Sequence, residues 1–192
     1  MKRFILASAS PRRKEILENA GFDFEIIVSD VDENITEDLS PSETVEELAK
    51  RKALAVWEEN KDAVVFGCDT VVAVDGKILG KPRDDDEAFA MIKMLSGKAH
   101  TVSTGVCICT EDKISVFSNT TNVEFYTLSD ETIRSYVATG ESRDKAGAYG
   151  IQGYGSVLIK EIKGDYFSVM GLPVSESSRV LADFGIYGKV RV

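Results

Sequence analysis

The chain has 192 residues, of which 43% are hydrophobic and 29% charged, as is typical of a soluble globular protein with one sizeable core. Its 32 acidic residues outnumber 23 Lys and Arg, and the net charge of −9 argues against nucleic-acid polymers or anionic membranes as partners. The N-terminal apolar run is too short for a signal peptide, and no run approaches the length of a transmembrane helix, so we expect a cytoplasmic protein.

Apolar periodicity and turn signals predict helices and strands in alternation. The expected order is strand 3–7, helix 11–19, strand 22–28, helix 41–58, strand 63–74, strand 77–80, helix 85–95, strand 99–109, strand 113–126, helix 130–138, strand 155–162 and helix 173–183. Short turns at 75–76 and 111–113 join strands directly, so we expect a mixed sheet in one α/β domain over residues 1–192.

The first expected helix has an unusual start. Ser10 is a good N-cap and Pro11 suits the first helical position, but Arg12 and Arg13 then fall in the first turn, where the helix dipole is already positive. A bound phosphate would balance this charge, although solvated surface arginines are an equal alternative. The second Ser-Pro start, at 40–43, instead carries Glu43 in the position of a capping box.

Charged residues between 29 and 58 have two interpretations each. Asp32 and Glu33 lie in an acidic stretch, 29–38, that either helps to hold a hard cation or forms a solvated loop. Lys52 falls on the apolar stripe of helix 41–58, four residues after Leu48. Taken alone, it is best explained as a lysine whose ammonium reaches the surface, and it gains functional weight only beside other signals.

Asp69 and Thr70 interrupt the strongly apolar strand 63–74, within GCDTVV. Aspartate is uncommon inside strands, and a carboxylate there needs a partner. It could accept structural hydrogen bonds in a bulge beside Gly67, or hold a metal or a proton in an active cleft. We favour the functional interpretation.

Two loops add further polar groups. Lys81, in LGKP, follows a strand end and could lie near the Asp69 strand, or be an ordinary exposed lysine. Segment 143–155, RDKAGAYGIQGYG, holds four glycines and Gln152, whose amide is both donor and acceptor. It lacks the P-loop and GxGxxG patterns, and a tight surface loop is the alternative. The acidic run 84–87 is expected to cap a helix.

Cysteine and histidine give little support for a structural metal site. Cys68, Cys107 and Cys109 form no CxxC pattern, and His100 is the single histidine. Alternation places Cys107 and Cys109 on one face of a strand, so we expect small core residues there and a histidine at the start of that strand.

Taken together, SASPRR, DEN, ELAKRKA, GCDTVV, LGKP and DKAGAYGIQG resemble, in order and over nearly the whole chain, the Maf family of nucleoside triphosphate pyrophosphatases. The resemblance implies an elongated mixed sheet flanked by helices, with two lobes and a central cleft, related to the inosine triphosphate pyrophosphatase fold. It also implies a homodimer and a divalent metal, Mg²⁺ or Mn²⁺.

Carried onto matching positions, the resemblance gives each residue a role. Asp69 looks like the catalytic proton acceptor and, with Glu33, a metal ligand. The cations expected around the triphosphate are Arg12, Arg13, Lys52 and Lys81. Arg12, Thr70 and Gln152 match positions associated with substrate selection, and the segment around Gln152 resembles the branch that acts on dTTP and UTP.

The resulting hypothesis is hydrolysis of dTTP and UTP to the nucleoside monophosphate and pyrophosphate, a reaction that also suits removal of non-standard nucleotides. One alternative keeps the phosphate site and changes the base to a modified purine, as in 7-methyl-GTP. Another is a non-enzymatic regulator of septum formation and cell division, because the family is historically linked to septum formation.

Overall fold

The computed structural model describes residues 2–35 and 38–192. The chain divides into two compact units. The first unit contains residues 1–69, 104–119 and 171–192, and the second contains 70–103 and 120–170. Across the described ranges, no helix is both long and apolar enough to cross a membrane. The single domain over 1–192 stays a prediction.

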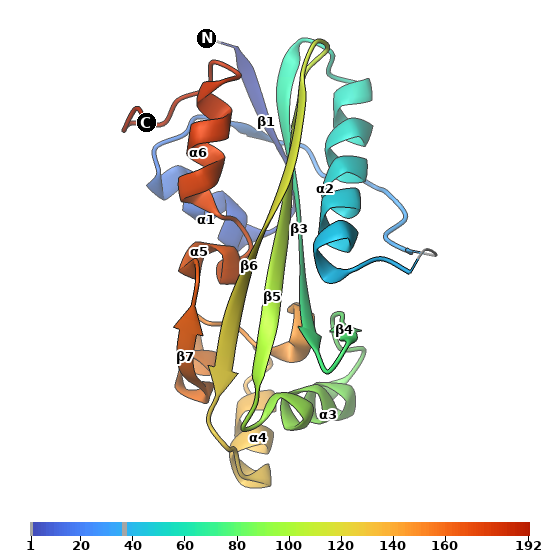
Figure 1. The fold of residues 1–192 in the computed structure, drawn as a ribbon, viewed down its shortest axis with the longest axis vertical. Helices are drawn as coiled ribbons and strands as arrows, with labels where there is room; N and C mark the ends of the chain where they lie inside the picture. Colours follow the sequence, from blue (N-terminus) through green and yellow to red (C-terminus); the bar gives the residue numbers. More distant parts are fainter. Residues whose placement is uncertain (1, 36–37) are drawn as a thin grey trace. The chain divides into compact units, whose positions relative to one another are not determined.

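A mixed sheet of seven strands is present in the described part of the chain, as the sequence predicts (Figure 1). The strand order is β2-β1-β3-β5-β6-β7, with β4 paired to β3. β1 is parallel to β2 and β3, whereas β4 is antiparallel to β3 and β7 to β6. The strands are β1 (Arg3–Ala7), β2 (Glu25–Ile26), β3 (Ala63–Val74), β4 (Lys77–Leu79), β5 (Ala99–Cys109), β6 (Ile114–Phe125) and β7 (Ile159–Lys163).

The first unit contains α1 (Pro11–Asn19), α2 (Pro41–Glu58) and α6 (Val174–Ala182). Figure 1 shows α2 running beside β3, and small residues fill the layer between this helix and the strands. Cys107 and Cys109 belong to that layer as buried free thiols, which confirms their expected role. Phe4, Phe22 and Phe66 pack edge to face in the same unit.

The second unit contains α3 (Asp85–Leu95), α4 (Asp130–Val137), α5 (Tyr166–Met170) and the 3₁₀ turns η1 (Ala146–Ala148) and η2 (Gly153–Leu158). Its core includes the fully buried side chains Ile92, Leu95, Phe125, Ile133 and Leu158. The turn after β3 has positive φ at Asp75 and Gly76, 49° and 76°, as expected for a two-residue hairpin. The acidic run 84–87 caps α3, since Glu87 N donates to Asp84 Oδ1 over 2.8 Å.

Some predicted bounds are wrong. The strand expected at 22–28 shortens to β2, because its partner β1 ends at Ala7 and the chain leaves it after the Ile27 N–H donates to Leu6 O. The strand expected at 155–162 begins only at Ile159, since 153–158 form a 3₁₀ turn. The sequence analysis missed α5. The other ends that differ shift by one residue: the last residue of the strand expected at 155–162, and ends of the elements expected at 77–80, 113–126, 130–138 and 173–183.

Candidate functional site

Lys52 of α2 and Asp69 of β3 form a buried ion pair in the first unit. Lys52 Nζ lies 2.6 Å from Asp69 Oδ1, and the two residues are 9% and 8% exposed. The interpretation of Lys52, taken alone, as a lysine whose ammonium reaches the surface is therefore wrong. Burying two charges is costly even when they pair, so stability alone is a weak reason for this arrangement.

Two glycines let α2 approach the sheet closely enough to make this pair. A Cβ added at Gly67 of β3 would collide with the Ala49 carbonyl oxygen, and one added at Gly105 of β5 would collide with that of Val45. Gly67 and Asp69 are two residues apart and share one face of β3. The side chain missing at Gly67 thus brings α2, and with it Lys52, against the Asp69 carboxylate.

Glu33 completes a group of three charges. Its Oε1 lies 2.7 Å from Lys52 Nζ, although the Glu33 side chain is 58% exposed. Arg51 anchors the loop that carries it, because Arg51 Nη1 donates to the Asn34 carbonyl over 3.0 Å. The sequence analysis missed Arg51, whose signal was a second cation beside Lys52. Thr36 and Glu37 of the acidic stretch lie outside the described residues.

The start of α1 has the cap that the sequence predicts. Arg13 N donates to Ser10 Oγ over 3.4 Å, and Pro11 is the first helical residue. The Arg13 guanidinium is held from outside the helix: Nε donates to Gly171 O over 2.9 Å, and Nη1 to Ser8 Oγ over 3.1 Å. Arg12 is half-buried at the second helical position.

Strand register and a shared acceptor link this helix start to Asp69. β1 and β3 are parallel with Ala7 opposite Gly67, so Ser8 follows the end of β1 beside the stretch of β3 that holds Cys68 and Asp69. Gly171 O, which binds Arg13, also accepts a hydrogen bond from the Cys68 thiol over 3.0 Å. Burial raises the pKa of Cys68 to about 11, so this thiol stays neutral and is no nucleophile at pH 7.

The first unit thus contains five predicted site residues. Direct contacts join Glu33, Lys52 and Asp69, and Gly171 ties Arg13 to the residue before Asp69. Sequence reasoning missed Ser8 and Gly171. Ser8 directly follows an apolar strand, which was a usable signal, but a carbonyl 158 residues from Arg13 gives none.

Thr70, Lys81 and Gln152 belong to the second unit. Thr70 and Gln152 are half-buried and Lys81 is exposed. The Gly147 N–H donates to the Gly80 carbonyl over 3.0 Å, which connects the Lys81 loop to the glycine-rich segment. That these three residues join Asp69 around one substrate stays a prediction.

His100 lies at the start of β5, as expected, and is buried against the glycine-rich segment. His100 Nε2 lies 2.7 Å from the Tyr149 hydroxyl. Burial lowers the pKa of His100 to about 4, so the ring is neutral at pH 7. This pair acts as a structural support for the segment that carries Gln152.

Comparison with known proteins agrees with these motifs. The family model described as Maf-like protein matches residues 3–184. A dTTP/UTP pyrophosphatase of Bacillus pumilus is 51% identical over 186 residues, covering 97% of this chain and 98% of that protein. The proteins of the same name from Bacillus cereus and Bacillus anthracis are each 53% identical, with 97% of both chains covered. The chain belongs to the Maf family.

Proposed function

We propose that this protein is a nucleoside triphosphate pyrophosphatase that hydrolyses dTTP and UTP to the nucleoside monophosphate and pyrophosphate. The observation that carries the proposal is the buried Lys52–Asp69 pair, which is extended by Glu33 and lies beside the end of β1, the strand that leads into α1. The names of relatives about half identical to this chain support the same substrates.

Phosphate binding follows from the cations of the first unit. A triphosphate repels an incoming nucleophile, so its oxygens must be neutralised before attack. Arg13 presents a guanidinium fixed by Gly171 and Ser8, and Arg12 stands one residue before it at the positive end of α1. Lys52 adds an ammonium, and we assign Lys81 to the same triphosphate.

Asp69 is the proposed proton acceptor. Lys52 binds one of its oxygens, Oδ1, and thereby fixes the orientation of the carboxylate. The second oxygen can then take a proton from a water molecule that attacks the α-phosphorus. The bond between the α-phosphorus and the bridging oxygen breaks, and pyrophosphate leaves with the electron pair of that bond.

Glu33 and Asp69 are the proposed ligands of a divalent cation. Two carboxylates already share the positive charge of Lys52, and carboxylate oxygens are the donors that Mg²⁺ and Mn²⁺ prefer. Within the described ranges no group of three or more His, Cys, Asp or Glu residues is arranged to hold a metal ion, so substrate phosphates and water would supply the other ligands. Such a cation, when bound, neutralises phosphate charge and makes its bound water more acidic.

Gln152 and Thr70, with Arg12, are the proposed residues of base selection. A glutamine amide can pair with the O4 and N3–H edge of uracil or thymine, because it offers a donor and an acceptor side by side.

Two further expectations, a homodimer and a cytoplasmic location, stay predictions.

The test is product analysis with purified protein, Mg²⁺ and dTTP or UTP. We expect pyrophosphate and the monophosphate, and a loss of at least about 100-fold in kcat for Asp69→Asn, which removes the proton acceptor. Asp112→Asn, at an exposed aspartate of the turn between β5 and β6, is the matched control and should leave kcat unchanged.

Any one of four results would contradict the proposal. Release of inorganic phosphate would mean that a different bond breaks. Unchanged turnover in Asp69→Asn would remove this carboxylate from the chemistry. A strong preference for 7-methyl-GTP would favour the purine alternative, and nucleotide binding without turnover would favour a regulator.

A further inference from the structure

The carboxylate of Glu141 closes the loop that carries Gln152. Glu141 Oε2 accepts the Tyr154 N–H over 2.8 Å, and Oε1 accepts the Gly155 N–H over 2.9 Å. The Tyr136 hydroxyl donates to the same Oε1 over 3.0 Å. Hydrogen bonds to a charged carboxylate are stronger than those between neutral groups. One side chain therefore fixes the backbone that follows Gln152.

The backbone before Gln152 is held by the same group of residues. The Gly150 N–H donates to the Tyr136 hydroxyl over 3.2 Å, so Tyr136 links this amide to Glu141. Lys145 Nζ donates to the Glu141 carbonyl over 2.6 Å, which holds the chain at Glu141 itself. Gln152 thus lies two residues from an anchored amide on either side.

Two glycines show how tightly the loop is closed. A Cβ at Gly153 would collide with Glu141 Oε2, and φ there is +65°, where glycine is favoured. A Cβ at Gly155 would collide with the Gly150 carbonyl oxygen. These contacts fix both the path of the backbone and its distance from the carboxylate.

We propose that Glu141 is a positioning residue for Gln152, and that it sets how tightly and how selectively the protein binds pyrimidine nucleotides. The proposal rests on the function proposed above. An amide that discriminates bases must hold its donor and acceptor in one orientation, and a loop without anchors would have to be ordered at the moment of binding. Glu141 orders this loop in advance.

The principal variant is Glu141→Gln, which keeps the shape of the side chain. Its amide group would face a backbone N–H that needs an acceptor, so one anchor is lost. We expect KM for dTTP and UTP to rise about tenfold, with kcat within about twofold of wild type, as for a loss of binding rather than chemistry. KM for GTP should change little, so the ratio of kcat/KM for dTTP or UTP to kcat/KM for GTP should fall.

A second readout needs no nucleotide. Amide hydrogen exchange in residues 150–155 should be faster in Glu141→Gln than in the wild-type protein. Tyr136→Phe, which removes the linking hydroxyl and keeps the ring, should shift KM and exchange in the same direction by a smaller amount. Glu131→Gln removes an exposed carboxylate from α4 and is the control for charge, with no expected change in either readout.

The outcomes separate this proposal from the proposed function. If the wild-type protein hydrolyses dTTP and UTP but Glu141→Gln keeps the same KM and preference, the positioning role is overturned. Unchanged exchange in 150–155 would also overturn it. Equal losses for all nucleotides, in kcat as well as KM, would indicate general damage and contradict it. Inactivity of the wild-type protein on both pyrimidine nucleotides would overturn the proposed function first.

Discussion

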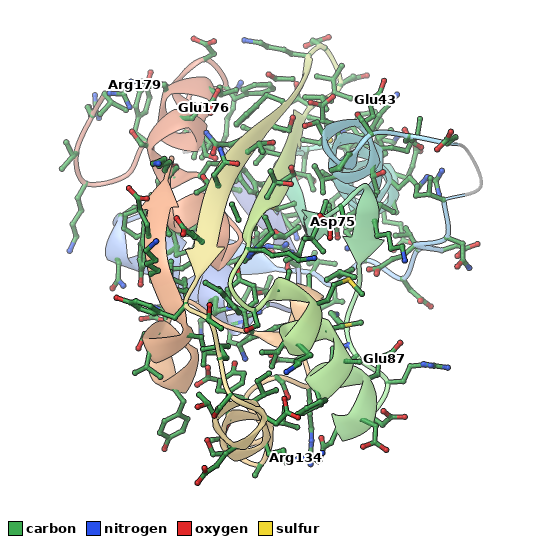
Figure 2. All side chains as sticks on the ribbon, turned by 60° about the horizontal axis from the view of Figure 1, so that its bottom comes forward. Glu43, Asp75, Glu87, Arg134, Glu176 and Arg179 are labelled. Atoms are coloured by element: carbon green, nitrogen blue, oxygen red, sulfur yellow. The ribbon has the colours of Figure 1, made fainter. Side chains whose placement is uncertain are left out.

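The helices α1 and α2 begin with the same two residues, Ser and Pro, but differ in the residues that follow. Each has a Ser N-cap followed by Pro, but the third helical residue is Arg13 in α1 and Glu43 in α2. Glu43, labelled in Figure 2, accepts the Ser40 N–H over 2.9 Å and the Ser40 hydroxyl over 2.6 Å, which completes a capping box. The start of α2 is therefore satisfied by its own carboxylate.

Arg13 instead turns away from its helix and binds Gly171 O and Ser8 Oγ. It adds positive charge where the helix dipole is already positive. The third helical residue thus decides which group balances the positive start of the helix. A glutamate there closes a capping box, whereas an arginine leaves a start that is suited to an external anion. Three exchanges between the two starts test this.

The largest effect is expected for Arg13→Glu, which gives α1 the third residue of α2. Arg13 is the proposed phosphate-binding cation, so reversing its charge should lower kcat/KM for dTTP on the order of 100-fold or more. The free energy of unfolding should change by only about 1 kcal/mol, because a new capping box offsets the lost bonds to Ser8 and Gly171. Steady-state kinetics and urea unfolding measure both, and unchanged kcat/KM would contradict the comparison.

Arg12→Ser should have an intermediate effect and is the cleaner exchange, since it matches Ser42 of α2 and leaves the bonds of Arg13 in place. We expect kcat/KM for dTTP to fall about tenfold, as for loss of one charged contact. The free energy of unfolding should stay equal or rise by a few tenths of a kcal/mol, because an unfavourable charge leaves the helix start. A large loss of stability without nucleotide would make Arg12 a structural residue.

The smallest effect is expected for Glu43→Arg, the reverse exchange. It should lower the melting temperature by a few degrees and leave nucleotide kinetics unchanged, because the proposed site residue of α2 is Lys52 and not a residue at the start of the helix. Hydrogen bonds from Ser40 lower the pKa of Glu43. The stability that this carboxylate gives is thus present above its usual pKa and is lost as pH falls through the lowered value, so the difference in melting temperature between wild type and variant should narrow there. Thermal unfolding from pH 7 to 3 checks this, and a constant difference would contradict it.

Most of the fold could be predicted because local signals agree with it. Alternating apolar residues, Ser-Pro starts and the Asp75-Gly76 turn locate most elements within one residue, although the strand expected at 22–28 shortens to Glu25–Ile26. The late start of the strand expected at 155–162 has a distant cause: Glu141 accepts hydrogen bonds from the Tyr154 and Gly155 N–H groups and holds 153–158 in a 3₁₀ turn. No nearby residue carries that information.

Part of the candidate site could be predicted because charge conflicts there with local structure. Lys52 on an apolar stripe and Asp69 inside a strand are each anomalous, and the structure places them 2.6 Å apart. Gly171 and Glu141 could not be assigned roles in the same way. Gly171 contributes a carbonyl and Glu141 an acceptor for two amides, and neither contribution shows as an anomaly in sequence.

Gly67 and Gly105 have a consequence for mutational tolerance. Neither can take part in chemistry, yet a single methyl group at either would push α2 away from the sheet and separate Lys52 from Asp69. Alanine is uncharged and is tolerated in many strands, but at either glycine it would leave the buried Asp69 carboxylate without the Lys52 ammonium. The positions least able to vary in this protein thus include two that carry no functional group at all.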